Sequence, residues 1–188
     1  MKKQFFCIFF SPLFLFTSEI FGQKKTLEVG GKLINELTFY NGFAPGIGAQ
    51  VIYRMSNKSG IESGLYYKIR PISFLSFPPN STTIYYVEVS EKNLLFPVLY
   101  RFDSRYVNFT IGPVLEYFLG WKFRPHQSEV VIKDYITESF ELIATASISR
   151  NFNLKNNWSI EPELRFSAFV PNGDGGYGLN LSFRKKLN

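Results

Sequence analysis

The sequence is poor in the two residue types that build disulfides and zinc sites, because it has one cysteine, Cys7, and one histidine, His126. Cys7 lies in an N-terminal segment that we expect to be removed, so the mature chain has no thiol for a disulfide or a cysteine nucleophile. A single histidine without cysteine does not make a zinc site of the usual kind. We therefore expect no disulfide, no metal and no cofactor.

The apolar run at the N-terminus is too short for a membrane-spanning helix. It covers Phe5–Phe16, whereas a spanning helix needs roughly 20 apolar residues. A short basic start, Met1–Lys3, precedes this run, and the small residue Gly22 follows it. This pattern is typical of a secretory signal. We predict a cleaved signal peptide over residues 1–22 and a single outer-membrane β-barrel domain over residues 23–188.

The sequence also lacks the signatures of nucleic-acid and nucleotide binding. It has no phosphate-binding glycine loop, no basic recognition helix and no RNA-binding aromatic motif. The formal net charge is +6, a small basic excess that we interpret as solvated surface rather than contact with anionic headgroups. We therefore expect no nucleic acid among the partners.

Aromatic residues are abundant, at 18% of the chain, although the mean hydropathy is only −0.04. The reason is an alternation of apolar and polar residues with period two. In residues 61–70, Ile61 and Leu65 belong to an apolar face, whereas Glu62, Lys68 and Arg70 belong to a polar one. A strand between lipid and a polar lumen has this pattern, whereas a helix would scatter the charges around its axis.

Eight segments fit such strands, although one of them changes phase. In residues 84–102 the apolar positions are odd up to Val89 and even from Leu94. We predict a bulge or a short break near Glu91–Asn93 as the cause. The eight predicted strands cover residues 27–33, 47–55, 61–70, 84–102, 107–121, 140–149, 158–170 and 177–184.

The connections alternate between short and long, as in barrels with short periplasmic turns and longer outer loops. The fold class is therefore all-β: an eight-stranded antiparallel up-and-down transmembrane β-barrel. We expect short turns at residues 56–59, 103–105 and 153–157, and longer connections at 36–45, 71–83, 122–138 and 171–176.

An eight-stranded barrel is only wide enough for its interior to be filled by side chains. Its inward positions carry charges of both signs, including Glu28, Lys32 and Arg54. Buried charges must pair, so we expect a plugged lumen rather than a pore, with a proton or ion path as the alternative. The predicted ion network contains Glu62, Lys68, Arg70, Arg101, Glu116, Glu161, Glu163, Arg165 and Arg184. A predicted aromatic girdle near the strand ends contains Tyr53, Tyr85, Phe102, Trp121, Trp158 and Tyr177.

Three short segments resemble the PorT-like outer-membrane β-barrel families. They are Gly60–Tyr67 (GIESGLYY), Leu94–Phe102 (LLFPVLYRF) and Val107–Tyr117 (VNFTIGPVLEY). The resemblance implies a small exported barrel and carries no catalytic residues. One departure is the C-terminus, where Arg184–Asn188 replaces the terminal aromatic common among exported barrels.

Four functions remain open at this point. The first is a non-enzymatic barrel, embedded in outer-membrane lipid, whose loops at 71–83 and 122–138 contact a protein or polysaccharide. The second, implied by the resemblance, is an accessory part of a secretion or envelope-assembly system. The third is a lipid-modifying enzyme in which His126, near Ser128, Glu129 and Asp134, activates a hydroxyl. The fourth is a soluble, lipocalin-like ligand carrier. Periodicity alone does not say which strand face is lumenal.

Overall fold

The structure is a computed structural model that describes residues 26–39, 42–76, 85–123, 140–169 and 175–187. This part of the chain is almost entirely β-strand. None of its helices has the length and apolarity needed to cross a membrane. The elements are β1 (Thr26–Thr38), β2 (Gly42–Arg54), β3 (Ser59–Ser76), β4 (Tyr85–Asp103), β5 (Asn108–Phe123), β6 (Phe140–Ser149), β7 (Phe152–Asn153), the 3-10 turn η3 (Lys155–Asn157), β8 (Trp158–Phe169) and β9 (Gly175–Leu187).

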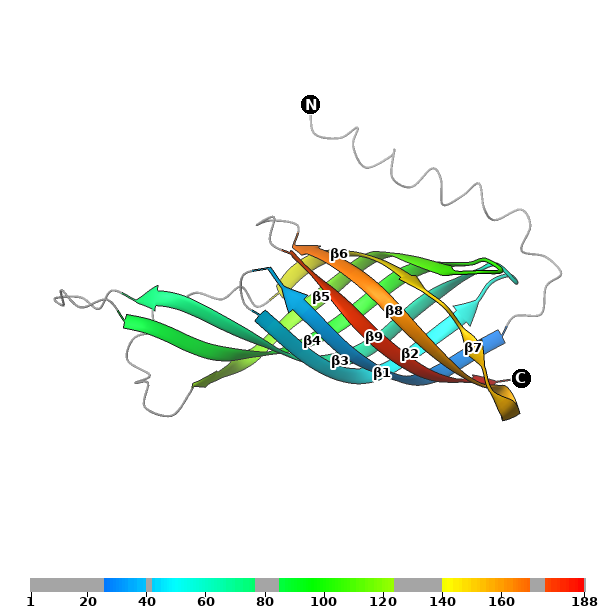
Figure 1. The fold of residues 1–188 in the computed structure, drawn as a ribbon, viewed down its shortest axis with the longest axis horizontal. Helices are drawn as coiled ribbons and strands as arrows, with labels where there is room; N and C mark the ends of the chain where they lie inside the picture. Colours follow the sequence, from blue (N-terminus) through cyan, green and yellow to red (C-terminus); the bar gives the residue numbers. More distant parts are fainter. Residues whose placement is uncertain (1–25, 40–41, 77–84, 124–139, 170–174, 188) are drawn as a thin grey trace, which may run out of the picture.

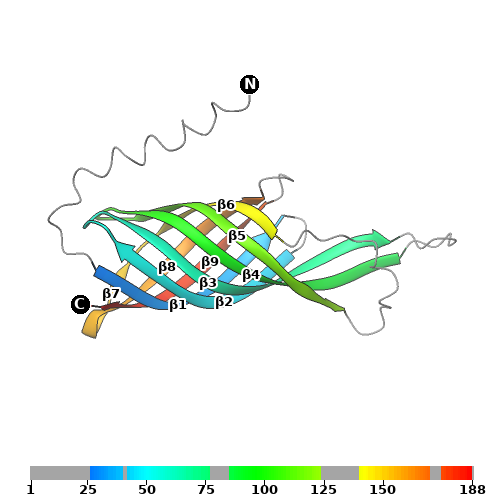
Figure 2. The same cartoon turned by 180° about the vertical axis from the view of Figure 1, so that it is seen from behind.

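The strands form one antiparallel sheet that closes on itself (Figures 1 and 2). Each strand from β1 to β5 pairs with the next, β9 pairs with both β1 and β8, and β6 pairs with β8 to complete the ring. The two-residue strand β7 pairs only with the beginning of β8 and lies in the connection before it. The predicted eight-stranded up-and-down barrel is therefore confirmed.

The barrel has two unlike ends. At the turn end lie the connections β2–β3, β4–β5 and β6–β8, together with the start of β1 and the end of β9 (Figure 1). At the opposite, loop end, β3, β4 and β5 project beyond the other strands (Figure 2). The pairing of β3 with β4 continues to Ser76↔Tyr85, whereas the last pair between β2 and β3 is Gly46↔Lys68.

Several strands are longer than the sequence pattern indicated. The long connection predicted at residues 36–45 is wrong, because Glu36 pairs with Ala44 and only residues 39–41 separate β1 from β2. The connection predicted at residues 71–83 begins later, since β3 continues to Ser76. Pro71 fits there because, beyond Lys68, the described partner of β3 is β4 alone, and edge strands tolerate proline.

A register shift lies at the position predicted along β4, but the extra residue belongs to the neighbouring strand, β5. Lys92 pairs with Gly120 and Asn93 with Phe118, so the extra residue is Leu119 of β5. Odd residues of β4 point inward on both sides of this level, since Val89 and Asn93 are both buried. The predicted position of the irregularity, near Glu91–Asn93, is therefore confirmed, but the extra residue belongs to β5, and β4 itself does not change phase. The pattern misled because this part of the lumen wall includes apolar residues.

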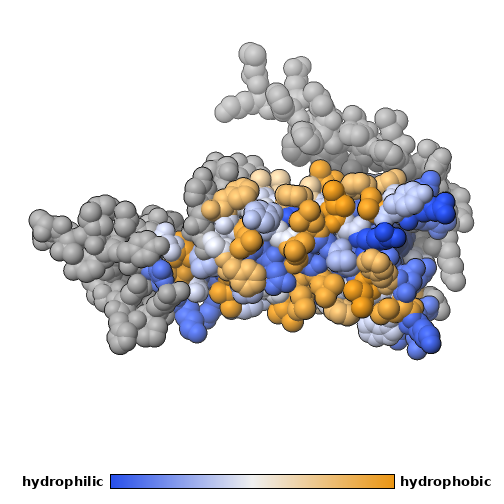
Figure 3. All heavy atoms as spheres, viewed as in Figure 1, coloured by the Kyte–Doolittle hydropathy of each residue, from blue (hydrophilic) through white to orange (hydrophobic). Residues whose placement is uncertain are grey.

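The two faces of the sheet have opposite chemistry. Large apolar side chains such as Leu65 and Leu115 are exposed on the outside. Apolar residues, coloured orange, cover much of the barrel wall in Figure 3. The enclosed face is mostly polar and charged. Six of its buried apolar side chains form one small cluster on the lumen wall: Ile34, Tyr66, Leu95, Leu99, Val114 and Ile143.

Tyr66 explains two glycines in its neighbourhood. A Cβ atom on Gly48 would lie 2.4 Å from the Tyr66 ring, and one on Gly64 would lie 3.0 Å from the Tyr66 hydroxyl. The ring therefore lies over both glycines, close to the backbone of β2 and β3. An aromatic side chain that covers glycine in this way helps to fix strand register.

Candidate functional site: the ion-paired lumen

The first of two charged clusters in the lumen begins at Lys32 on β1. Its ammonium group donates to Glu62 Oε1 at 3.0 Å and to Glu163 Oε2 at 2.6 Å. Glu163 also accepts from Arg165 Nε at 2.6 Å. Lys32 and Glu163 are far apart in the sequence, and barrel closure brings them together across the lumen.

The same cluster continues toward the turn end through Arg101. Its guanidinium lies 3.3 Å from Glu62, 2.9 Å from Asp103 and 2.8 Å from Glu161. Glu161 also accepts from Arg184 and from the Ser149 hydroxyl. We call this cluster the turn-side network; its five carboxylates and five cations are Glu28, Glu62, Asp103, Glu161, Glu163, Lys32, Arg54, Arg101, Arg165 and Arg184.

A second cluster, the loop-side network, lies nearer the loop end and is acidic. Lys68 Nζ lies 3.3 Å from Glu36 and 3.1 Å from Glu116. Arg70 Nε donates to Glu91 at 2.7 Å, and Arg70 Nη2 lies 3.3 Å from Glu141. Asn93 donates to Glu116 at 2.5 Å. Its charged members are four carboxylates and two cations: Glu36, Glu91, Glu116, Glu141, Lys68 and Arg70.

These two networks fill the described lumen. Arg101, Arg165 and Arg184 are among its largest fully buried side chains. These arginines and their carboxylate partners form a plug of interlocking ion pairs. Five buried polar atoms have no hydrogen-bond partner among the described residues. Two of them, Glu28 Oε2 and Arg184 Nε, lie 3.2 Å apart as an ion pair, and the other three are Tyr66 Oη, Gln50 Nε2 and Arg165 Nη2. The arrangement is that of a packed interior rather than an open aqueous channel.

The structure places every predicted lumen residue on the enclosed face. Glu62 and Arg101 have no exposed surface, and Arg70, the most exposed of the nine, is only 7% exposed. The predicted ion network lacks five residues that the structure adds: Glu36, Glu91, Asn93, Asp103 and Glu141. Glu36 lies in a predicted connection and Glu91 at the predicted break, but the alternation of polar and apolar residues continues along the longer strands and indicates an inward side chain at both.

The predicted girdle residues are distributed over both ends. Tyr53, Phe102 and Trp158 are exposed near the turn end, and Tyr177 is exposed near the loop end. Trp121 lies beyond the bulge, where it pairs with Glu91 and is half-buried against Phe118, with 5.0 Å between ring centroids. The Tyr85 side chain lies outside the described part of the structure.

The residues of the catalytic hypothesis, His126, Ser128, Glu129 and Asp134, lie outside the described residues, as does the predicted signal peptide over 1–22. Among the residues that are described, no group of three or more histidine, cysteine, aspartate or glutamate side chains is placed to hold a metal ion.

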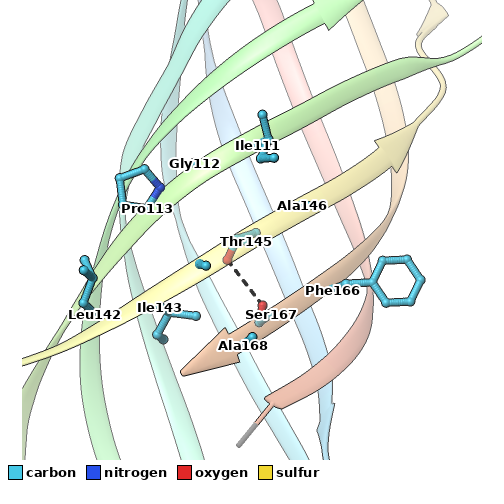
Figure 4. Close-up of a pocket in the computed structure, with 11 residues that line it drawn as sticks. Ile111, Gly112, Pro113, Leu142, Ile143, Thr145, Ala146, Phe166, Ser167 and Ala168 are labelled. Atoms are coloured by element: carbon cyan, nitrogen blue, oxygen red, sulfur yellow. Dashed lines mark hydrogen bonds between the residues drawn. The ribbon is translucent and has the colours of Figure 1, made fainter. Parts of the chain in front are cut away.

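The outer wall carries a shallow apolar groove of about 470 Å³ across β5, β6 and β8. Figure 4 shows small residues such as Ala146 and Ala168 at its floor and larger ones such as Ile111 and Phe166 at its sides. The hydroxyls of Thr145 and Ser167 bond to each other at 3.4 Å behind it. Because its lining is apolar apart from these two hydroxyls, the groove could accommodate an apolar group but presents no reactive side chain.

The described chain thus forms a closed antiparallel barrel with an apolar exterior and an ion-paired interior. No family model matches the sequence, and no curated protein matches it. Among solved structures, Ail, the attachment invasion locus protein of Yersinia pestis, is similar with a TM-score of 0.45 and 11% identity over 87% of this chain and 97% of that chain.

Two further structures show a similar degree of likeness. Neisserial surface protein A has a TM-score of 0.46 and 13% identity over 87% of this chain and 97% of its own. The N-terminal β-barrel domain of Pseudomonas aeruginosa OprF has a TM-score of 0.41 and 13% identity over 87% and 98%.

Proposed function

We propose that this protein is a small, non-enzymatic outer-membrane β-barrel that is held in lipid by its outer face and presents its loop end for contacts outside the cell. The observation that carries the proposal is the inverted distribution of side chains, with charges enclosed and large apolar groups exposed. Water would penalise such an exterior, whereas hydrocarbon favours it.

The dimensions of the barrel support this location. The shortest strand of the ring, β6, has ten residues. At about 3.3 Å per residue and a tilt of roughly 45°, such a strand spans on the order of 23 Å. Barrels in the outer membrane have an apolar band about 25 Å tall. A closed ring also leaves no unpaired strand edge within the hydrocarbon, where unsatisfied backbone groups are costly.

The side-chain faces argue against the soluble ligand carrier. A lipocalin-like carrier needs an apolar interior to hold its ligand and a polar exterior to stay in solution. Here Glu62, Arg101 and Arg165 are enclosed, whereas Leu65 and Phe166 are exposed. The filled lumen also argues against a porin.

In this proposal the loop end of the barrel makes the contacts outside the cell. The projecting strands β3, β4 and β5 lead into the connections that include most of the loops predicted at residues 71–83 and 122–138. Residues 77–84 and 124–139 of these connections lie outside the described residues. A protein or polysaccharide partner that contacts this end fits a barrel with no catalytic group in its described lumen, and nucleic acid is not a partner we propose.

The resemblance to PorT-like barrels leads to a narrower form of the proposal, an accessory role in secretion or envelope assembly. Deletion of the protein followed by an assay of exported proteins tests this form, and unchanged export contradicts it. Sequencing the N-terminus of the protein isolated from membranes tests the predicted removal of residues 1–22. The enzymatic alternative is tested by H126A, since an altered lipid profile in that variant favours catalysis.

Two experiments test the membrane location. The folded protein in detergent should migrate faster on an unheated gel than after boiling, because a closed barrel resists detergent. In cells it should remain in the outer-membrane fraction after a carbonate wash. Recovery in the soluble periplasmic fraction contradicts the proposal, and so does the absence of any heat-dependent shift in migration.

A further inference from the structure

Among the described residues, the charges outside the lumen are almost all positive, and most of them gather at the turn end. Of the described residues outside the two lumen networks, eight are basic and one, Glu88, is acidic. Lys92 and Lys122 belong to the loop-end half. The other six basic residues lie in the turns or at the end of β9: Lys58, Arg105, Arg150, Lys155, Lys185 and Lys186.

Three of these basic side chains lie over aromatic rings. The Arg105 guanidinium is 5.8 Å from the centroid of the Tyr106 ring, and the Arg150 guanidinium is 5.6 Å from that of Phe152. The Lys185 ammonium is 5.8 Å from the Trp158 ring centroid. Each of these pairs places a positive charge beside a flat side chain at the rim of the barrel.

The turns also expose large apolar groups that water alone does not favour. Tyr106 is 68% exposed and Leu154 is 50% exposed, although both lie in turns rather than on the outer wall of a strand. Aromatic residues beside basic ones are typical of the membrane–water interface, where rings sit at the level of the headgroups and cations meet the phosphates.

We propose that the turn end carries a collar that binds the phosphate groups of anionic phospholipids. This turn-end collar consists of Arg105, Arg150 and Lys185 with their aromatic partners, flanked by Lys58, Lys155 and Lys186. The inference rests on the proposed membrane location and adds the lipid class that this rim selects. It also gives the basic excess of the sequence a role other than solvation.

Charge complementarity supports this occupant. At the described turn end, the acidic side chains other than Asp103 are well enclosed in the lumen. Asp103 is less enclosed, but its two carboxylate oxygens contact Arg54 and Arg101 of the turn-side network. The collar cations are thus left to act outward, where an anionic headgroup places its phosphate. A zwitterionic headgroup would carry its own cation into the same positive region.

The test uses the two tryptophans, which lie toward opposite ends of the barrel. W121F leaves Trp158 as a reporter within the collar, and W158F leaves Trp121 as a reporter toward the loop end. The mature chain is folded into two kinds of vesicle. Both contain unlabelled phosphatidylcholine; one also contains brominated phosphatidylglycerol and the other contains brominated phosphatidylcholine, with the bromine near the headgroup. Quenching of each reporter measures the local preference for the anionic lipid.

The collar predicts stronger quenching of Trp158 by brominated phosphatidylglycerol than by brominated phosphatidylcholine, with no such preference at Trp121. A basic side chain near an anionic surface contributes about fivefold in affinity, so the triple variant R105Q/R150Q/K185Q should abolish the preference. The matched control K92Q/K122Q, which removes basic residues outside the collar, should leave it unchanged. About 1 M salt, which shortens the Debye length to about 3 Å, should weaken the preference without any substitution.

Equal quenching of Trp158 by the two lipids overturns the collar, as does a preference that survives the triple variant or high salt. If neither lipid quenches either tryptophan, the membrane location itself fails, and this result is distinct from failure of the collar. The heat-dependent gel shift of each variant checks that the barrel has formed.

Discussion

Removal of one carboxylate from the turn-side network should destabilise the barrel strongly. Glu161 accepts from Arg101 at 2.8 Å through both of its oxygens, and also from Arg184 and Ser149. Its side chain is 1% exposed, so water neither screens these pairs nor replaces them. In E161Q the network keeps five cations but only four carboxylates.

The magnitude follows from the cost of an uncompensated buried charge. Breaking a buried ion pair by removing one partner costs about 3–5 kcal/mol. Arg101 keeps Glu62 and Asp103, and Arg184 keeps Glu28, which favours the lower half of that range. With a urea dependence of about 2 kcal/mol per molar, E161Q should lower the unfolding midpoint by roughly 1.5–2 M.

The assay is urea unfolding of the protein in vesicles, followed by tryptophan fluorescence and by the unheated gel shift. The double variant E161Q/R184Q restores equal numbers of charges and should be more stable than the sum of the two single variants predicts. The exposed K186Q should change the midpoint little. The reasoning is refuted if E161Q unfolds within about 0.5 M of the parent, or if the two substitutions are additive.

Three further predictions concern other parts of the barrel. Tyr66→Phe removes a buried hydroxyl without a partner among the described residues, so it should leave the free energy of unfolding unchanged or raise it by about 1 kcal/mol; a large loss in urea titration speaks against this assignment. Gly48→Ala places a methyl group 2.4 Å from the Tyr66 ring and 2.2 Å from Leu65 O, which should cost about 1–3 kcal/mol. Gly31→Ala, whose nearest neighbour lies 3.7 Å away, is the matched control, and equal midpoints would contradict the close approach. Leu65→Arg on the outer wall should cost about 2–4 kcal/mol if its site lies near the bilayer midplane, whereas Ser104→Arg in a turn should cost little; refolding yields into vesicles compare the two.

The sequence was most informative where a strand has one polar and one apolar face. In residues 61–70, the alternation alone places Glu62, Lys68 and Arg70 together, and the structure encloses all three. The same logic failed along β4 because apolar Val89 faces inward at the level where the pattern changes phase, as Leu95 and Leu99 do further along the strand. Where both faces carry apolar residues, hydrophobicity no longer reports which side is inward.

Two features of the structure depend on closure of the ring, and no pattern within a single strand or turn of the sequence predicts them. Lys32 meets Glu163 across the lumen, and no spacing within β1 or β8 indicates that partner. The basic residues of the collar are scattered between Lys58 and Lys186, so they look like ordinary surface charge in the sequence. The up-and-down topology brings them to one rim.

The central claim is that hydrocarbon covers the apolar wall while the ion networks fill the interior. Removal of residues 1–22 leaves no native cysteine, so single cysteines at Leu65, Leu115 and Ser104 can each carry a nitroxide in vesicles. Leu65 and Leu115 are exposed on the outer wall, and Ser104 lies in a turn. Power-saturation spectroscopy then measures the access of apolar oxygen and of a water-soluble nickel chelate. The account predicts high oxygen and low nickel access at residues 65 and 115, with the reverse at residue 104. High nickel access at residues 65 and 115 would contradict it.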